Sequence, residues 1–396
     1  MSSFGLNPVL NSLLNTVLNP GLVSAVESVV RSVGAPGPLP VPPVPSSVLR
    51  PAYGTLQQGF AAAAFAHKQA SSRLLRFVTN GGREERSLDP QLLASLRQTM
   101  VDLNDRDWAD GEAGVYPLSL LVDRPWGEFA AAYPWMCLDT WRTWDRAQNE
   151  RHQEFDTAID TAGYPAYYLQ NFHHQTDGYL SDFSANLYDL QVEVLFNGTA
   201  DAMRRRVLAP LREGLNAFAD VPPSQVRVLD GACGTGRTLR FLRSMLPLAS
   251  LVGVDLSPAY LRKANQWLSA VPGDVPQLVR GNVEALPFAD GTFHGVTSTF
   301  LFHELPAAVR KTAIAELYRV AKPGAVLVLC DSIQAGDRPE WTPMIESFPQ
   351  MFHEPYYRHY ITDDLVAHLT AAGFEAVRTE VHFVSKYWIA RKPNDA

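Results

Sequence analysis

A glycine-rich stretch between an apolar run and a helical segment is the feature of this sequence with the clearest chemical meaning. Residues 226–242 read VRVLDGACGTGRTLRFL, so we expect a strand that ends at Asp230 and a helix that begins near Arg237. Glycine in such a turn lets a ligand approach the backbone, and the start of a helix offers free N–H groups. The stretch predicts a ligand site at the end of a strand.

The spacing of the glycines excludes two common phosphate sites. Gly234 and Gly236 are followed by Leu239 at the position where the dinucleotide fingerprint G-x-G-x-x-G needs a third glycine. A P-loop needs a lysine and then a serine or threonine after its last glycine, and no lysine follows here. We therefore expect neither of these phosphate-binding loops.

An adenosine ligand without phosphates fits the next two segments. Asp255 ends a second apolar run, where a carboxylate can accept hydrogen bonds from both ribose hydroxyls. Residues 281–288, GNVEALPF, follow a third run and offer an amide beside apolar groups, which suits the edge and the ring of adenine.

Four segments in order, LDGACGTG, VDLSPAYLRKA, GNVEALPFADGTFHGV and LYRVAKPGAVLVL, resemble the motifs of class I S-adenosylmethionine-dependent methyltransferases. Within that class they are similar to the small-molecule branch that includes the ubiquinone and menaquinone C-methyltransferases. The resemblance covers residues 220–396. It implies S-adenosyl-L-methionine as cofactor and an α/β fold, a Rossmann-like class I methyltransferase sheet, here joined to a mostly helical N-terminal domain.

The resemblance also implies where the cofactor is bound. The first motif lines the methionine moiety, Asp255 binds the ribose, and Asn282 with Val283 flanks the adenine. The sequence departs from the family at Ala232, where a first glycine is usual, and at Asn282, where an acid is usual. The expected cofactor-binding set is Asp230, Gly231, Ala232, Gly234, Gly236, Asp255, Leu256, Asn282, Val283 and Phe300.

Two segments supply candidate catalytic residues. His303 and Glu304 follow the fourth expected strand, and His303 is a candidate general base or acceptor contact, unless it merely hydrogen-bonds the backbone. Residues 164–189, YPAYYLQNFHHQTDGYLSDFSANLYD, form a polar-aromatic segment that suits a lid over an apolar, partly hydroxylated ligand. From it we select His174 and Tyr179, although these side chains could equally make ordinary interdomain contacts.

We expect no metal site. His173 and His174 are adjacent rather than four apart, so one helix cannot present both to one ion, and single histidines usually satisfy local hydrogen bonds. Residues 341–361 either shape an acceptor pocket or form a helical cap on residues 164–189. Residues 373–393 predict a final antiparallel hairpin.

Composition excludes several classes of protein. Lys and Arg number 34 against 41 Asp and Glu, and the basic run Arg204-Arg205-Arg206 is too short to indicate nucleic-acid binding. Three scattered cysteines predict neither a disulfide framework nor a zinc site, and suit a cytoplasmic protein. Apolar runs fall short of the 18 or more residues, roughly, of a transmembrane helix.

The whole chain divides into four segments that differ in composition and expected structure. Residues 1–34 predict an amphipathic helical segment, for which packing on the protein or on a second subunit is favoured over a membrane surface. Residues 35–51 hold seven prolines and predict an extended linker, residues 52–219 a helical lid, substrate and assembly domain, and residues 220–396 the methyltransferase domain. A homodimer through the N-terminal region is expected.

These features together predict methyl transfer to a small, aromatic or lipophilic acceptor. The sequence does not identify the acceptor atom. The alternative is a non-catalytic binding or regulatory protein on a degenerate methyltransferase scaffold.

Overall fold

The computed structural model describes residues 46–79, 89–271 and 273–395. The helical segment expected over residues 1–34, and the first part of the proline-rich linker, lie outside the described residues. Over the described ranges no helix is both long and apolar enough to cross a membrane. The homodimer and the cytoplasmic location stay predictions.

A seven-stranded sheet forms the centre of the molecule, in the order β3-β2-β1-β4-β5-β7-β6. The pairs among β1 to β5 are parallel, and β7 is antiparallel to both of its neighbours. This confirms the expected Rossmann-like sheet and the C-terminal hairpin. The strands are β1 (Arg227–Gly231), β2 (Ser250–Asp255), β3 (Gln277–Arg280), β4 (Phe293–Thr299), β5 (Ala321–Ser332), β6 (Glu375–His382) and β7 (Ser385–Arg391).

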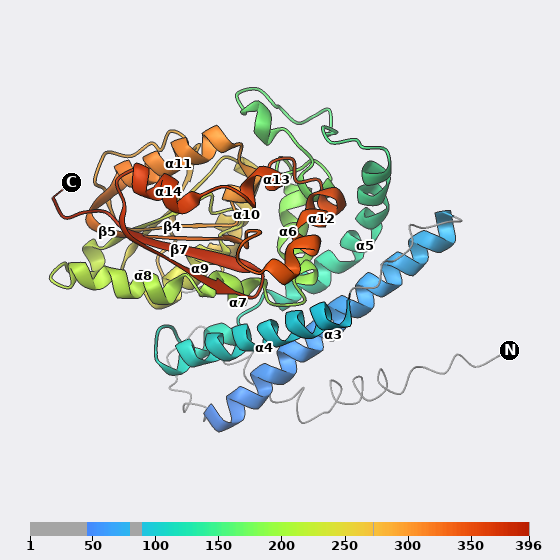
Figure 1. The fold of residues 1–396 in the computed structure, drawn as a ribbon, viewed down its shortest axis with the longest axis horizontal. Helices are drawn as coiled ribbons and strands as arrows, with labels where there is room; N and C mark the ends of the chain where they lie inside the picture. The colour runs from blue at the N-terminus through green and yellow to red at the C-terminus, as the bar shows by residue number, and fades with distance from the viewer. Residues whose placement is uncertain (1–45, 80–88, 272, 396) are drawn as a thin grey trace.

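Alternate strand residues face two separate cores, because successive side chains point to opposite faces of a sheet. Leu229 of β1 belongs to the core beneath α11 (Ala307–Val320) and α14 (Leu365–Ala371). Its neighbour Val228 belongs to the core formed with α8 (Leu208–Leu215), α9 (Arg237–Met245) and α10 (Pro258–Ser269). Figure 1 shows α11 and α14 above the strands and α8 and α9 below them.

Helix α8 belongs to this sandwich although it precedes residue 220. A Cβ atom on Gly214 would lie 2.4 Å from the Cβ of Val326. Helix α8 can therefore pack this closely against β5 only because residue 214 is a glycine. The boundary near residue 220 stays a prediction, but the helical layer of the sheet starts before it.

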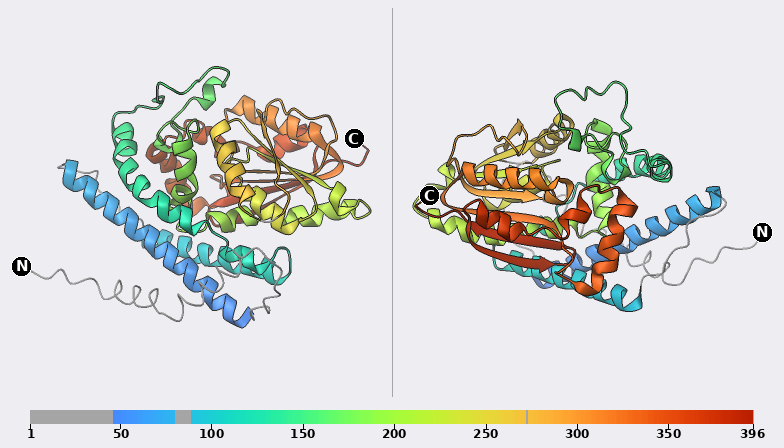
Figure 2. Two further views of the ribbon diagram at one scale, coloured as in Figure 1. Left: turned by 180° about the vertical axis from the view of Figure 1, so that it is seen from behind. Right: turned by 45° about the horizontal axis from the view of Figure 1, so that its top comes forward.

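The N-terminal region is mostly helical, as expected, and its first two described helices cross outside the layer formed by α8 and α9 (Figures 1 and 2). A buried ion pair joins the second and the last helix of this region: Asp107 accepts hydrogen bonds from Arg205 Nε at 2.9 Å and Nη2 at 2.6 Å. The α-helices of this region are α3 (Ser46–Thr79), α4 (Pro90–Glu112), α5 (Trp126–Gln148), α6 (Asp182–Leu195) and α7 (Ala200–Arg205).

The extended linker expected over residues 35–51 is wrong for its last six residues, because α3 begins at Ser46. Six of the seven prolines precede Ser46, and only Pro51 falls inside the helix. A single proline near a helix start leaves enough backbone hydrogen bonds for the helix to continue.

Short helical elements connect the longer helices and strands. Helix α12 (Thr342–Phe352) contacts η3, within the predicted lid, so residues 341–361 form the helical cap rather than lining the site. The other short elements are η1 (Leu118–Val122), η2 (Ala166–Tyr168), η3 (Phe172–His174), η4 (Asn216–Phe218), η5 (Pro223–Gln225), η6 (Phe302–Glu304), η7 (Pro339–Trp341) and α13 (Tyr357–Tyr360).

Candidate active site

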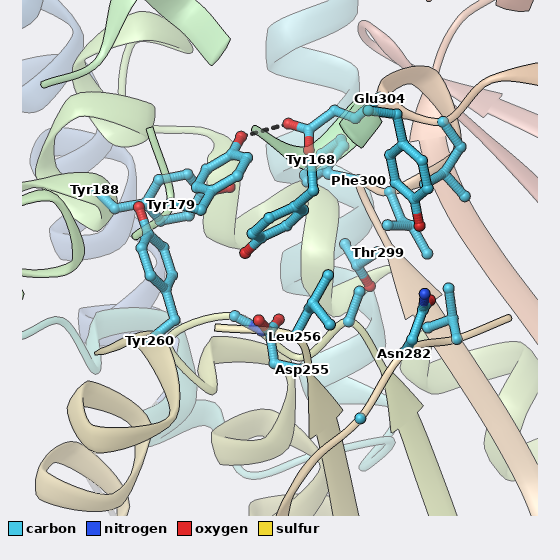
Figure 3. A pocket seen from close by; sticks show the side chains of 17 residues that line it. Tyr168, Tyr179, Tyr188, Asp255, Leu256, Tyr260, Asn282, Thr299, Phe300 and Glu304 are labelled. Atoms are coloured by element: carbon cyan, nitrogen blue, oxygen red, sulfur yellow. Dashed lines mark hydrogen bonds between the residues drawn. The ribbon is translucent and has the colours of Figure 1, made fainter. Parts of the chain in front are cut away.

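A pocket lies at the carboxyl ends of the parallel strands, where open α/β sheets bind their ligands. One wall comes from the loops after β1, β2 and β3, and the other from the lid segment and the loop after β4 (Figure 3). The pocket is lined by Tyr167, Tyr168, Tyr179, Tyr188, Ala232, Gly234, Asp255, Leu256, Tyr260, Gly281, Asn282, Val283, Thr299, Phe300, Leu301, Glu304 and Leu305.

The glycine-rich loop after β1 leaves its backbone open to this pocket. Ala232 and Gly234 both adopt positive φ, of 58° and 54°, and a Cβ atom on Gly234 would meet nothing within 4 Å. Gly236 serves packing instead: it starts α9 with φ of 80°, and a Cβ there would lie 3.1 Å from the Cβ of Ala264. Gly231 and Gly236 are not among the lining residues.

Asp255 is fixed at the end of β2 by two backbone donors. Its Oδ2 accepts from the N–H of Gly234 at 2.8 Å, and its Oδ1 accepts from the N–H of Ser257 at 2.8 Å. Burial raises the pKa of this carboxyl group, and the backbone donors oppose that rise. The carboxylate is therefore held in one orientation while still lining the pocket.

Asp230 is the last residue but one of β1, one position before the strand ends, and it is not among the residues that line the pocket. It is buried and accepts a hydrogen bond from Thr297 Oγ1 at 2.9 Å. Burial raises its pKa to about 7. Asp230 is thus placed to support the loop and not to line the pocket.

The third motif is tied to the lid through Glu284. The side-chain amide of Asn282 donates to Glu284 Oε2 at 2.8 Å, and the hydroxyl of Tyr167 donates to the same oxygen at 2.7 Å. The lid segment therefore bonds directly to the segment expected to flank adenine.

Tyrosines form the wall opposite the glycine-rich loop. The rings of Tyr179 and Tyr260 meet edge to face at 5.4 Å between centroids, and Tyr188 contacts both. The hydroxyl of Tyr179 donates to the carboxyl group of Glu304 (Figure 3). Burial, followed by the charge of Glu304, raises the pKa of Tyr179 well above its usual value, so this hydroxyl stays a donor.

Of the three predicted catalytic residues, only Tyr179 lines the pocket. His303 turns away from it and pairs through Nδ1 with Asp331 Oδ1 at 2.6 Å. His174 lies among other histidines, 5.8 Å from the ring of His152 and 5.9 Å from that of His353, and burial lowers its pKa to about 4. The structure therefore does not bring His174 and His303 to the pocket wall.

Nine of the lining residues lie outside the expected cofactor-binding and catalytic sets, and the sequence carried signals for three of them. Glu304 follows His303 directly, and Glu304 rather than His303 lines the pocket. Tyr260 lies in the first turn of α10, five residues after Asp255, and Thr299 ends β4. A strand end indicates the neighbourhood of a ligand, but side-chain direction depends on the turn that follows.

Comparisons with known proteins find a matching family and several similar chains. A family model described as a methyltransferase domain matches residues 228–324. An uncharacterised methyltransferase of Synechocystis sp. is 32% identical over 164 residues, which are 41% of this chain and 72% of the relative. A demethylmenaquinone methyltransferase of Lactiplantibacillus plantarum is 29% identical over 229 residues, 53% of this chain and 90% of the relative. A solved S-adenosylmethionine-dependent methyltransferase from Aquifex aeolicus is 22% identical, covers 48% of this chain and 97% of its own, and has a TM-score of 0.33.

The sheet order and the pocket at its carboxyl edge are those of a Rossmann-like α/β fold. With the family match and the relative from Synechocystis, the chain belongs to the class I S-adenosylmethionine-dependent methyltransferases.

Proposed function

We propose that this methyltransferase binds S-adenosylmethionine in the pocket and methylates a small molecule of aromatic or lipophilic character. One observation carries the proposal. The pocket joins the residues of the methyltransferase motifs on one wall to four tyrosines on the other, Tyr167, Tyr168, Tyr179 and Tyr188 from the lid segment. Aromatic rings with polar tips suit an acceptor that is apolar but carries a hydroxyl or carbonyl group.

The residues on the motif wall fit the cofactor. Asp255 would accept hydrogen bonds from the ribose hydroxyls, and Asn282 and Val283 would lie against adenine. The backbone at Ala232 and Gly234 would accommodate the methionine moiety, since the space over Gly234 is open. When bound, S-adenosylmethionine supplies an electrophilic methyl group on a sulfonium ion.

The chain itself would mainly align the reactants and exclude water. Methyl transfer is a displacement in line, so holding the acceptor in the reactive geometry lowers the barrier. Tyrosine faces attract a cation, which favours the sulfonium on this side of the pocket. Tyr179 and Glu304 are the polar groups of the lid side that would face the acceptor.

Isothermal titration of the full chain with S-adenosylmethionine tests the cofactor site. Asp255→Ala should weaken binding by about 1.5–3 kcal/mol, or roughly 10- to 150-fold in Kd, since charge-assisted hydrogen bonds are lost. Asp274→Asn, an exposed acid in the same region, is the control and should bind as the wild type does. An unchanged Kd for Asp255→Ala would refute this placement of the ribose.

Transfer of a labelled methyl group then tests the acceptor class. Incorporation should occur with lipophilic phenols or hydroquinones and not with transfer RNA, DNA or peptides. Label found only in a macromolecular fraction would contradict the small-molecule proposal, whatever the titration shows.

A further inference from the structure

Behind the lid side of the pocket, four potential metal ligands from three separate segments converge. They are His173 of η3, His303 and Glu304 of η6, and Glu354, which follows α12, and their ligand atoms all lie within 4.8 Å of one another. Two imidazoles with two carboxylates are a donor set used for divalent transition metals. The expectation of no metal site rested on the adjacency of His173 and His174, whereas the fold brings His173 close to His303, 130 positions away.

The distances fit one ion. His303 Nε2 lies 3.8 Å from Glu304 Oε1, and His173 Nε2 lies 3.9 Å from the same oxygen. His173 Nε2 also contacts Glu354 Oε1. With metal–ligand bonds of about 2.0–2.2 Å in a tetrahedron, ligand atoms stand about 3.3–3.6 Å apart, so small side-chain shifts would centre these atoms on an ion.

His303 is oriented as metal-bound histidines are. Its Nδ1 pairs with Asp331 Oδ1 at 2.6 Å, and Asp331 is fixed in turn by the N–H groups of Phe302 at 2.6 Å and Ser332 at 2.7 Å. A carboxylate on Nδ1 sets the tautomer in which Nε2 carries the free lone pair. That Nε2 atom is the one that faces the cluster.

Glu354 provides the independent sign that something is bound here. Its side chain is completely buried: Oε1 lies against His173 Nε2, and Oε2 has no hydrogen-bond partner among the described residues. Apart from this mutual contact, neither group has a hydrogen-bond partner there. A buried carboxylate oxygen without a donor carries a large desolvation cost, which a coordinated cation would remove.

The backbone beside the ligands is strained in the same region. His173 has φ of 55° and His353, next to Glu354, has φ of 43°, both left-handed. Phe300, shortly before His303, has φ of 56°. Non-glycine residues in this conformation cluster where the surrounding structure serves a site, which agrees with a ligand cluster but does not by itself require one.

We propose that His173, His303, Glu304 and Glu354 bind one divalent transition-metal ion, with Asp331 positioning His303. Glu304 also lines the pocket, so the ion would stand at the boundary of the acceptor space. Resting on the proposed function, we further assign the ion the role of holding an oxygen atom of the methyl acceptor. Metal binding itself does not depend on that role.

The first measurement is metal content of the full chain after loading with Zn²⁺ and removal of excess, by inductively coupled plasma mass spectrometry. Wild type should retain about one ion per chain, and Glu354→Gln should retain less than about a tenth of that. Glu346→Gln is the matched control, since Glu346 is an exposed acid on α12, and it should retain the ion. Retention below a tenth in folded wild type, or equal retention in Glu354→Gln, would overturn the site.

A second variant guards against misfolding of Glu354→Gln. His173→Asn should also lose the ion, and Co²⁺-loaded wild type should show a visible absorption band that this variant lacks. Circular dichroism and S-adenosylmethionine titration should match wild type in both variants, because neither side chain lines the pocket. If wild type and His173→Asn give the same Co²⁺ spectrum, the proposal is refuted.

The proposed role of the ion toward the acceptor can be refuted independently of metal binding and of cofactor binding. An enzyme that binds Zn²⁺ and S-adenosylmethionine normally, but methylates its acceptor at the same rate and with the same acceptor KM after metal removal, would refute only that role. A wild-type protein that does not bind S-adenosylmethionine would instead contradict the proposed function. The metal measurement would still test the metal site.

Discussion

The two walls of the pocket are built in different ways. The motif wall is formed mainly by backbone: the loop has positive φ at Ala232 and Gly234, and its one carboxylate, Asp255, is fixed by backbone donors. The lid wall is formed by side chains, since tyrosine rings pack against one another and Tyr179 hydrogen-bonds to Glu304. A backbone-built wall leaves a short, contiguous motif in the sequence, whereas a side-chain-built wall depends on contacts between distant segments.

Loss of the buried ion pair between α4 and α7 should give the largest effect. Asp107 and Arg205 are both almost completely buried, and the hydroxyls of Tyr53 and Tyr116 also donate to Asp107, at 2.8 Å and 2.6 Å. Asp107→Ala should lower the free energy of unfolding by about 3–5 kcal/mol, because it leaves a buried guanidinium unpaired. Urea unfolding followed by circular dichroism measures the loss.

Asp290→Ala is the control for that ion pair. Asp290 pairs with Arg319, but its side chain is 82% exposed, so its loss should cost less than about 1 kcal/mol. Equal losses in the two variants would mean that the buried ion pair contributes no more to stability than the exposed one.

Sequence reasoning succeeded where local signals suffice. The strand, glycine loop and helix around Asp230, and the position of Asp255 after β2, follow from the pattern of residues 226–255 alone. The unusual aromatic composition of residues 164–189 predicts a ligand-facing segment, and four of its tyrosines line the pocket; its action as a lid stays a prediction.

Long-range pairing was beyond that reasoning. The run Arg204-Arg205-Arg206 is a short basic patch in the sequence, yet all three side chains are buried, and Arg205 pairs with an acid 98 residues away. In the same way, nothing near His303 indicates that Asp331 turns it from the pocket, or that Glu354 approaches His173. The periodicity of a segment shows which face is buried, but not which distant charge that face meets.

Asp230 predicts a measurable pH dependence. Its pKa is raised by burial to about 7, so between the ordinary value near 4 and pH 7 the folded state holds a proton that the unfolded state has released. Stability from this group is therefore highest at low pH and falls as pH rises, by about 1.4 kcal/mol per pH unit, or about 2–3 kcal/mol from pH 5 to 7.

Asp230→Asn should remove this slope, because the amide cannot ionise but can still accept from Thr297. The quantity to follow is the difference in unfolding free energy between variant and wild type, measured without S-adenosylmethionine from pH 5 to 8. It should grow in favour of the variant as pH rises. Parallel curves would show that Asp230 ionises normally, and that its burial has been overstated.

The smallest effect is expected at Ala232, where the loop adopts the backbone of a glycine without having one. Ala232 has φ of 58°, which costs a residue with a Cβ about 1–2 kcal/mol. Ala232→Gly removes this strain but adds freedom to the unfolded chain, so a net gain of about 0.5–1 kcal/mol is expected. Ala270→Gly, at an exposed position with φ of −80°, should give no gain in stability. There the glycine relieves no strain and only increases the conformational entropy of the unfolded chain. Thermal unfolding of both variants decides the matter: a gain in both would trace the effect to something other than backbone strain, and a loss at Ala232 would mean that its methyl group contributes packing that outweighs the strain.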